Sequence, residues 1–505
     1  MTKKEKRNLL IVLILFVCFV IAIGFVDYFR QKEIKASDND EKINKTEIVY
    51  NLPIVTIDIP KDEIVQNQFG DSNEVKAKIQ IYDNDAHHNQ LSQKPKKTLY
   101  AKVKIRGNST KMVPKKQFKL NITNKNYTKE KKTGMLGMPE SEEWVLNAPF
   151  EDKSLIRNAL AYQIGREIMP WAPQTKFCEV FYREQDDKGA MSDYYKGVYL
   201  MIEPIKRGKD RINIDKSDPD YNQTSFIVQQ NTTRGETSIA NSFGKENYLY
   251  DYPFIIEYPK RSLTDGQQEY IEKTLSLFEH SIFKDKKDRE YEKYIDVDSF
   301  VDYFIINEFL NNTDAGLLST YLYKDFGSKI YAGPIWDFNA CLGNSNLLSP
   351  YYDYQGFYMS RTSIYGKLLE HKEFTRKVIE RYRLLRKSYL SDDRLLAQVD
   401  QLVKSLGNAP ERNFKKWPIW ICNQFEMFKG HQDTFLEMGD DIDKMAAFLK
   451  KKENRHYLED TENMATSYKE EIKKMKVFIV NRGKWMDKNI QSLYDLSSEK
   501  NEGNE

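Results

Sequence analysis

Alternating apolar and polar residues mark the first part of the chain as rich in β-strands. Four segments show a two-residue period with many Val and Ile residues, a pattern typical of strands that bury one face. These segments cover residues 53–59, 75–82, 98–107 and 116–122. Two more strand-like segments, over 176–184 and 195–205, flank an acidic loop. We therefore expect an antiparallel β region at the start of the folded part.

Apolar residues three and four positions apart predict helices further along the chain. The first helical segment, residues 153–169, follows Asp152, a residue suited to capping a helix N-terminus. Helical spacing returns over residues 265–285, over 297–312 and from about 360 to the end. Residues 320–338 predict a β-hairpin that turns at Gly327. The order is β-rich, then mixed, then α-rich, which indicates an α+β protein.

The N-terminus carries the pattern of a membrane anchor. Residues 9–26 contain no charged side chain and would span about 27 Å as a helix, close to the thickness of a bilayer core. Basic residues precede this segment and no small-residue cleavage site follows it, so an uncleaved transmembrane signal anchor over 8–27 is favoured over a cleaved signal peptide. We expect a single-pass protein of the cell membrane, with the basic flank 1–7 in the cytoplasm and the large remainder outside.

The part after the anchor divides by its pattern into a tether and two folded parts. Residues 28–50 are polar and lack periodicity, which is typical of a tether. Residues 51–390 contain the predicted strands, the hairpin and the first helices, and we interpret them as the core. Residues 391–505 are predicted to be a helical C-terminal part that packs on this core.

Composition narrows the classes of function. The 505 residues are 40% hydrophobic and 30% charged, which is typical of a folded protein. Lys and Arg number 78 against 75 Asp and Glu, and the net +3 comes from residues 1–7 alone. The neutral remainder argues against nucleic acid as a partner. Four scattered Cys without a CxxC pair, and six His without ligand spacing, argue against a disulfide framework and a zinc site.

The first candidate for chemistry is a glycine-containing turn with cations on both sides. Residues 106–110 read RGNST, and residues 114–119 return through PKKQFK. A turn of this kind presents backbone N–H groups and basic side chains together, which suits a phosphate. A solvated hairpin edge with several Lys residues is the alternative. The chain contains no GxxxxGK[ST] motif, which argues against a P-loop enzyme.

The second candidate is a pair of aspartates. Asp314 ends the apolar segment that precedes the hairpin, and Asp337 follows the hairpin in the sequence GPIWDFN. Carboxylate oxygens suit a hard cation such as Mg²⁺, and a second carboxylate can accept the proton of an attacking hydroxyl. These are the two roles that phosphoryl transfer asks of a protein. The same pair also suits a glycosidase or two loop caps.

The order of these motifs resembles the CotH family, the spore-coat-type atypical protein kinases. The resemblance covers roughly residues 52–490 and rests on IRGNST with PKKQFKL, WVLN with DKSLIRNALA, KGVYLMIEPI, NEFLNNTDA with TYLYKD, GPIWDFNACLGN and NRGKWMDKNI. It implies a divergent protein-kinase-like fold, here preceded by one transmembrane helix. It also implies binding of ATP with Mg²⁺ or Mn²⁺ and phosphorylation of Ser or Thr on secreted, surface or coat proteins.

The resemblance assigns roles to individual residues. Lys116 looks like the lysine that holds nucleotide phosphates, with Arg106 close to the same loop, and Glu203 matches the family glutamate where the nucleotide is expected to lie. Asp314 falls where the family has its catalytic aspartate, and Asp337 where it has its metal-binding aspartate.

Two positions depart from the family pattern. Ser319 stands where the family commonly has Asn, and Asn339 stands where many relatives have a second Asp. Both positions fall among the expected metal ligands. Ser319 is a shorter and weaker donor than Asn, and the neutral Asn339 lowers the charge around the metal, so tighter dependence on Asp337 is expected. These departures favour an alternative in which the chain is a weak or silent cell-surface scaffold or adhesin. A surface glycan-modifying enzyme is a third hypothesis, drawn from the acid pair. The kinase hypothesis implies a protein substrate, and the anchor implies the lipid bilayer as a second partner.

Overall fold

The computed structural model describes residues 48–60, 74–107, 109–185, 191–232, 238–239, 252–283, 289–345, 350–424, 428, 430–431, 434, 438, 441–454, 456–459 and 463–497. The predicted flank 1–7 and the transmembrane helix over 8–27 lie outside these residues, as does most of the tether 28–50. A search of the described helices finds none that combines the length and the hydropathy needed to cross a membrane.

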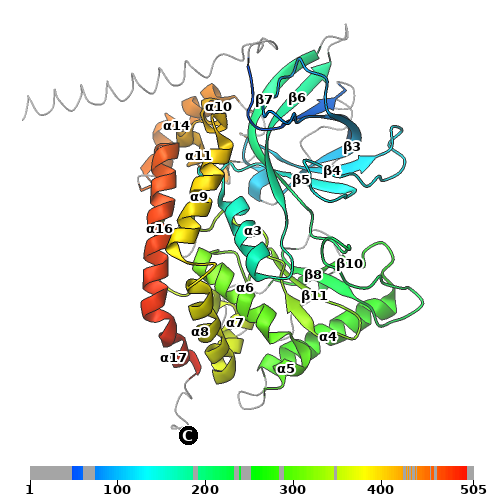
Figure 1. Ribbon diagram of the computed structural model, residues 1–505, viewed down its shortest axis with the longest axis vertical. Helices are drawn as coiled ribbons and strands as arrows, with labels where there is room; N and C mark the ends of the chain where they lie inside the picture. Colours follow the sequence, from blue (N-terminus) through cyan, green and yellow to red (C-terminus); the bar gives the residue numbers. More distant parts are fainter. Residues whose placement is uncertain are drawn as a thin grey trace, which may run out of the picture.

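Seven strands among the described residues form a closed barrel in the order β1, β2, β3, β4, β5, β7, β6 (Figure 1). Their bounds are β1 Ile54–Ile59, β2 Val75–Tyr82, β3 Lys97–Arg106, β4 Gln117–Thr123, β5 Glu143–Asn147, β6 Thr175–Gln185 and β7 Met191–Ile202. In β2, Val75, Ala77 and Ile79 point into the barrel core while the residues between them are exposed or half-buried. The alternation that predicted these strands therefore separates core from surface.

The predicted fold class is corrected by this barrel. The sequence predicted an antiparallel β region belonging to a kinase-like fold behind a transmembrane helix. Instead, β1 pairs in parallel with β6, from Ile54 opposite Glu179 onward, and this pairing closes the sheet on itself. Alternation reports which face of a strand is buried, but it does not report which distant strand is its neighbour, so closure was not visible in the sequence.

A second, five-stranded sheet lies beyond the barrel in the order β12, β11, β8, β10, β9, again within the described residues. The strands are β8 Phe226–Gln230, β9 Ser238–Ile239, β10 Phe254–Tyr258, β11 Thr320–Lys324 and β12 Ile330–Ala332. The predicted hairpin is confirmed, because β11 and β12 are antiparallel and Gly327 between them has a φ of +67°. Such a φ suits a residue without a Cβ.

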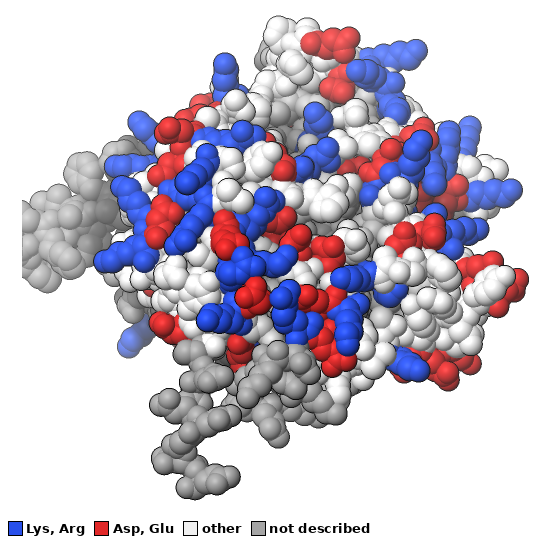
Figure 2. All heavy atoms as spheres, turned by 60° about the horizontal axis from the view of Figure 1, so that its bottom comes forward, with Lys and Arg blue, Asp and Glu red and all other residues white. Residues whose placement is uncertain are grey.

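Helices surround this sheet and run along one side of the molecule (Figure 1). They are α3 Arg157–Ile168, α4 Asp265–Phe283, α5 Tyr291–Tyr294, α6 Val297–Leu310, α7 Ser363–Glu370, α8 Lys372–Arg386, α9 Asp392–Leu406, α10 Ala409–Lys416, α11 Ile419–Cys422, α14 Ile442–Leu449, α15 His456–Glu459, α16 Tyr468–Asn489 and α17 Tyr494–Ser497. Four short 3₁₀ turns in the described residues are η1 Ser109–Lys111, η2 Met359–Arg361, η3 Lys452–Asn454 and η4 Ile490–Leu493. Figure 2 shows basic and acidic side chains interspersed over one face.

Buried ion pairs connect the helices around the second sheet. The Arg157 guanidinium on α3 contacts Asp152 at 2.6 Å and Glu471 on α16 at 2.7 Å, and all three side chains are buried. Arg482 on α16 pairs with Glu308 on α6 at 2.7 Å, also fully buried. A buried guanidinium needs such partners, because an unpaired charge in the interior is very costly. Asp152 accepts the backbone N–H of Arg157 at 2.9 Å, but α3 begins only at Arg157, with Ile156 at its N-cap, so the predicted helix start at 153 with Asp152 as the cap is wrong.

A separate apolar cluster connects the turn after β3 to the C-terminal helices. Met112 and Val113 follow η1 and pack with side chains of α10, α11 and α14. The apolar members from these helices are Phe414, Trp420, Ile421, Cys422, Ile442, Met445, Phe448 and Leu449, and Trp417 joins them from the position just after α10. The three Cys residues in the described part, Cys178, Cys341 and Cys422, are free and buried.

Candidate active site

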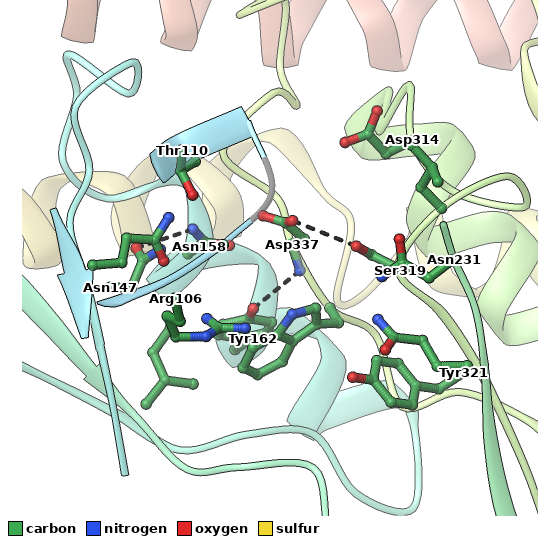
Figure 3. Close-up of a pocket in the computed structure, with 16 residues that line it drawn as sticks. Arg106, Thr110, Asn147, Asn158, Tyr162, Asn231, Asp314, Ser319, Tyr321 and Asp337 are labelled. Carbon is green, nitrogen blue, oxygen red and sulfur yellow. Dashed lines mark hydrogen bonds between the residues drawn. The ribbon is translucent and has the colours of Figure 1, made fainter. Parts of the chain in front are cut away.

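A cavity of about 230 Å³ lies where the barrel edge faces the second sheet and α3 (Figure 3). It is lined by Arg106, Gly107, Thr110, Gln117, Asn147, Asn158, Tyr162, Ile202, Gln229, Asn231, Asp314, Leu318, Ser319, Tyr321, Trp336 and Asp337. Arg106, Asp314, Ser319 and Asp337, all expected at the site from the sequence, therefore line one cavity. They come from distant parts of the chain, and the fold brings them together.

Asp314 lies in the turn after α6, on the wall formed by the second sheet. The helix ends at Asn311, which has a left-handed φ of +53°, and the chain then turns so that the carbonyl of Asp314 accepts the N–H of Leu318 at 2.8 Å. Burial, together with a smaller contribution from the negative charge of Asp337, raises the pKa of the Asp314 carboxyl to about 7. A carboxyl with this pKa can hold or release a proton near neutral pH.

Asp337 is held by its backbone as well as by its side chain. Its φ is +64°, and its N–H donates to the Tyr162 hydroxyl at 3.2 Å. The Ser319 hydroxyl donates to Oδ2 of Asp337 at 3.5 Å, and Ser319 itself has a φ of +52° (Figure 3). Non-glycine residues adopt such conformations at a cost of about 1–3 kcal/mol, and they concentrate at functional sites.

Opposing effects act on the pKa of Asp337. Burial raises it, while the positive charge of Arg106 and the hydrogen bond from Ser319 lower it, and the net shift is upward. The Arg106 guanidinium lies 5.6 Å from the centre of the Trp336 ring, and this ring stacks on Tyr162 at 5.9 Å. Arg106 is thereby held on the barrel side of the cavity as a cation whose charge acts on Asp337.

Neutral polar groups of the barrel and of α3 also line the cavity. Gln117 and Asn147 come from β4 and β5, and Asn158 comes from α3. Thr110, on η1, contributes a hydroxyl that is buried and has no hydrogen-bond partner in the described part of the chain. Donors of this kind match a ligand that carries oxygen acceptors.

Three residues expected at the site do not line the cavity. The Lys116 ammonium donates to the carbonyl of Lys111 at 2.6 Å, and burial lowers its pKa to about 8. Glu203 is fully buried, 3.3 Å from the Arg211 guanidinium, and its carboxylate accepts the N–H of Gln174. Asn339 is half-buried, and its carbonyl accepts from the Asn344 amide at 2.8 Å.

Other residues of the cavity were missed by sequence reasoning. Asn158 and Tyr162 stand four positions apart on α3 and accept the N–H groups of Phe338 and Asp337. Residues at this spacing share one helix face, so the i, i+4 pair of Asn158 and Tyr162 was the available signal. Gln117 and Asn147 fall within the segments PKKQFKL and WVLN, but neither was marked as a site residue, because each stands in a strand among ordinary β residues.

The protein combines a closed barrel with a part built from a sheet and helices, and the edge of the barrel faces two carboxylates on that part. The family comparison agrees with the order of the sequence motifs. The chain belongs to the CotH family: the family model described as "CotH kinase protein" matches residues 103–486. It is also similar to the "Inner spore coat protein H" of Bacillus subtilis (strain 168), with 23% identity over 257 residues. That match covers 49% of this chain and 62% of the relative.

The prediction of a single-pass membrane protein is corrected to what these findings support. The relative is a spore coat protein by its name, and no described helix is suited to span a bilayer. Residues 9–26, on which the prediction depended, lie outside the described residues.

Proposed function

We propose that this chain is a protein kinase that transfers the γ-phosphoryl group of ATP to Ser or Thr hydroxyls of coat proteins. The observation that carries the proposal is the meeting of Asp314, Asp337 and Arg106 in one cavity. Phosphoryl transfer needs a base for the attacking hydroxyl, a carboxylate for a cation and a positive group for the phosphates. The family name, CotH kinase protein, supports this choice of reaction, and coat proteins are proposed as the substrate because the relative is named as a spore coat protein.

The residues of the cavity fit a divalent cation and phosphate groups. Asp337, Asp314 and Ser319 offer oxygen atoms, which Mg²⁺ and Mn²⁺ prefer. When bound, the cation would supply charge neutralisation to the phosphate oxygens. At about 230 Å³ the cavity is smaller than typical ligand pockets of roughly 300–1,000 Å³, so it suits the phosphate end of a nucleotide rather than the whole.

Each charged side chain of the cavity has a different role in the proposed reaction. Asp314 accepts the proton of the substrate hydroxyl, since its pKa of about 7 suits exchange near neutral pH. Asp337 holds the cation, and the hydrogen bond from Ser319 together with the charge of Arg106 favours its ionised form. Arg106 binds phosphate oxygens from the barrel side.

The test compares the full chain with Asp337→Ala. Labelled ATP and Mn²⁺ or Mg²⁺ are incubated with each protein and a Ser-rich or Thr-rich coat protein, and transfer of label is measured. We expect transfer by the natural chain and a loss of roughly 10³-fold in the variant. Thermal unfolding with and without nucleotide provides a second measurement, since a bound nucleotide raises the midpoint. Absence of both label and thermal shift in the natural chain would falsify the kinase proposal.

A specific observation favours a second candidate, a scaffold with little or no catalysis. Lys116 and Glu203, which the family resemblance assigned to the nucleotide, have other partners and lie outside the cavity lining. In this case the coat protein substrate would bind without receiving phosphate. The same experiment separates the two, because a scaffold would transfer no label to the coat protein, with or without Asp337.

A further inference from the structure

Three side-chain amides connect the backbone beside Asp337 to the edge of the barrel. The N–H of Phe338 donates to Oδ1 of Asn158 at 2.7 Å, and Nδ2 of Asn158 donates to Oδ1 of Asn147 at 3.4 Å. Nδ2 of Asn147 then donates to Oε1 of Gln117 at 3.1 Å. All three amide residues are more than nine-tenths buried. We call Asn158, Asn147 and Gln117 the amide chain.

The direction of the amide chain follows from its first bond. The oxygen and nitrogen of a side-chain amide are usually assigned rather than observed, so either orientation is open in isolation. Here a backbone N–H begins the series, and a backbone N–H can only donate. Asn158 must therefore turn its oxygen toward Phe338 and its nitrogen toward Asn147. Asn147 then accepts on its oxygen and donates from its nitrogen to Gln117. Gln117 accepts this hydrogen bond on its oxygen, so its nitrogen remains available to donate to another partner.

Gln117 lines the cavity, and the direction of the amide chain leaves its nitrogen without a partner among the three amides. Gln117 is 7% exposed and lines the cavity, and no residue in the described ranges accepts a hydrogen bond from its Nε2. Gln117 also stands directly opposite Arg106 in the register of β3 and β4. The barrel edge therefore presents a guanidinium and an oriented amide N–H₂ from neighbouring strands.

We propose that Gln117 Nε2 is a binding donor for the phosphate oxygens of the ligand, and that Asn147 and Asn158 are positioning residues that orient it. The inference deepens the proposed function and rests on it for the identity of the ligand as a nucleotide. Because the amide chain begins at the residue after Asp337, it fixes the position of the Gln117 amide relative to the Asp337 carboxylate on the opposite wall. The site selects ligand atoms that accept hydrogen bonds.

The binding test uses the full chain and two ligands, Mg²⁺·ATP and inorganic tripolyphosphate, measured by calorimetry. Gln117→Glu keeps the shape of the side chain but replaces the donor with an anionic acceptor. We expect its affinity for both ligands to fall at least thirtyfold, and that of Gln117→Met to fall about tenfold. The matched control is Gln267→Glu. Gln267 is also fully buried, but its Nε2 donates to the carbonyls of Asp218 and Tyr221 outside the cavity lining. We expect this control to bind both ligands as the natural chain does.

A second variant tests the positioning role separately. Asn158→Asp still accepts from Phe338 but has no N–H₂ to donate, so Asn147 and Gln117 are expected to turn over and present an oxygen to the cavity. The measurement is the side-chain amide resonance of Gln117 in protein labelled with ¹⁵N-glutamine. Tripolyphosphate should shift this resonance in the natural chain and leave it unchanged in Asn158→Asp.

The outcomes distinguish this inference from the proposed function. Gln117→Glu and Gln117→Met binding tripolyphosphate as tightly as the natural chain would overturn the donor role while leaving the kinase proposal intact. Binding of tripolyphosphate by the natural chain, with loss in Gln117→Glu but no transfer from ATP, would support the donor and reject the kinase. Failure of the natural chain to bind either ligand would overturn both. Thermal midpoints without ligand identify any variant that fails to fold, and Gln117→Met then decides.

Discussion

The two walls of the cavity are built from different chemistry. The barrel wall offers Arg106 and neutral donors held by hydrogen bonds between amides. The opposite wall offers two carboxylates, and behind it stand buried ion pairs such as Glu308 with Arg482. Amide bonds fix direction without placing charge in the interior, whereas buried ions fix position at a desolvation cost. The barrel wall, which is proposed to bind phosphate groups, therefore contains no carboxylate among the described residues that line it. The wall with the two aspartates is instead stabilised from behind by buried ion pairs.

The largest expected effect comes from removing the base on the acidic wall. Asp314→Asn keeps the size of the side chain but cannot accept a proton, so we expect the rate of phosphoryl transfer to fall by roughly 10³-fold. Nucleotide affinity should change less than threefold, since the barrel wall remains intact. Single-turnover assays and calorimetry measure the two quantities. Equal losses in rate and affinity would contradict the assignment of proton transfer to Asp314 and of nucleotide binding to the barrel wall.

The next effect concerns the bracing of the acidic wall. Arg482→Met leaves the Glu308 carboxylate buried without its cation, and we expect a loss of about 3–5 kcal/mol in the free energy of unfolding. Arg376 is the matched control, because it pairs with Glu373 and Glu380 at the surface. Arg376→Met should cost less than about 1 kcal/mol. Urea denaturation measures both, and similar costs would show that the buried pair does not brace the wall.

The raised pKa of Asp314 gives a smaller effect that depends on pH. A carboxyl whose folded pKa is about 7, against an ordinary 3.8, binds its proton more tightly in the folded state. The folded state therefore loses stability as the pH rises from 4 to 7. Asp314→Asn removes this cost. In a chelator we expect it to match the natural chain near pH 4 and to exceed its stability by about 2 kcal/mol at pH 8, since Asp314 keeps partial contact with solvent. A constant difference across this range would reject the buried carboxylate as its cause.

The smallest expected effect is at Lys116. Its ammonium is bonded to the carbonyl of Lys111 and lies outside the cavity lining, so Lys116→Ala should change nucleotide affinity less than about threefold. Arg106→Ala should weaken the same affinity more than about tenfold, because Arg106 faces the cavity. Calorimetric titration of Mg²⁺·ATP ranks the two variants. The opposite ranking would move the phosphate site from Arg106 to Lys116.

Local sequence patterns predicted where the strands and turns lie, but they did not predict which distant strands pair with each other. The alternation in β2 and the turn at Gly327 each depend on residues close in sequence, and both agree with the structure. The need of buried Arg157 for a carboxylate was also predictable, because burial of a charge has a fixed consequence. Closure of the barrel was not predictable, since the pairing of β1 with β6 joins residues far apart in the chain.

The site shows the same limit at the level of single side chains. Asp314 and Asp337 each follow an apolar segment and were recognisable by type, but the orientation of two adjacent lysines was not. Lys115 is the fully buried one, and its ammonium donates to the carbonyl of Val198 and to Asn413 on α10. Asn413 lies far along the chain, so only the folded structure reveals which lysine points inward.

The packing of Met112 and Val113 against the C-terminal helices has a consequence for how mutational screens of this protein would be interpreted. These residues follow Thr110, so the turn that lines the cavity is supported by side chains such as Trp417. A substitution at Trp417 would shift that turn and lower ligand affinity from a distance. A screen scored on binding alone would then assign α10, α11 and α14 to the ligand site, although none of their residues lines the cavity.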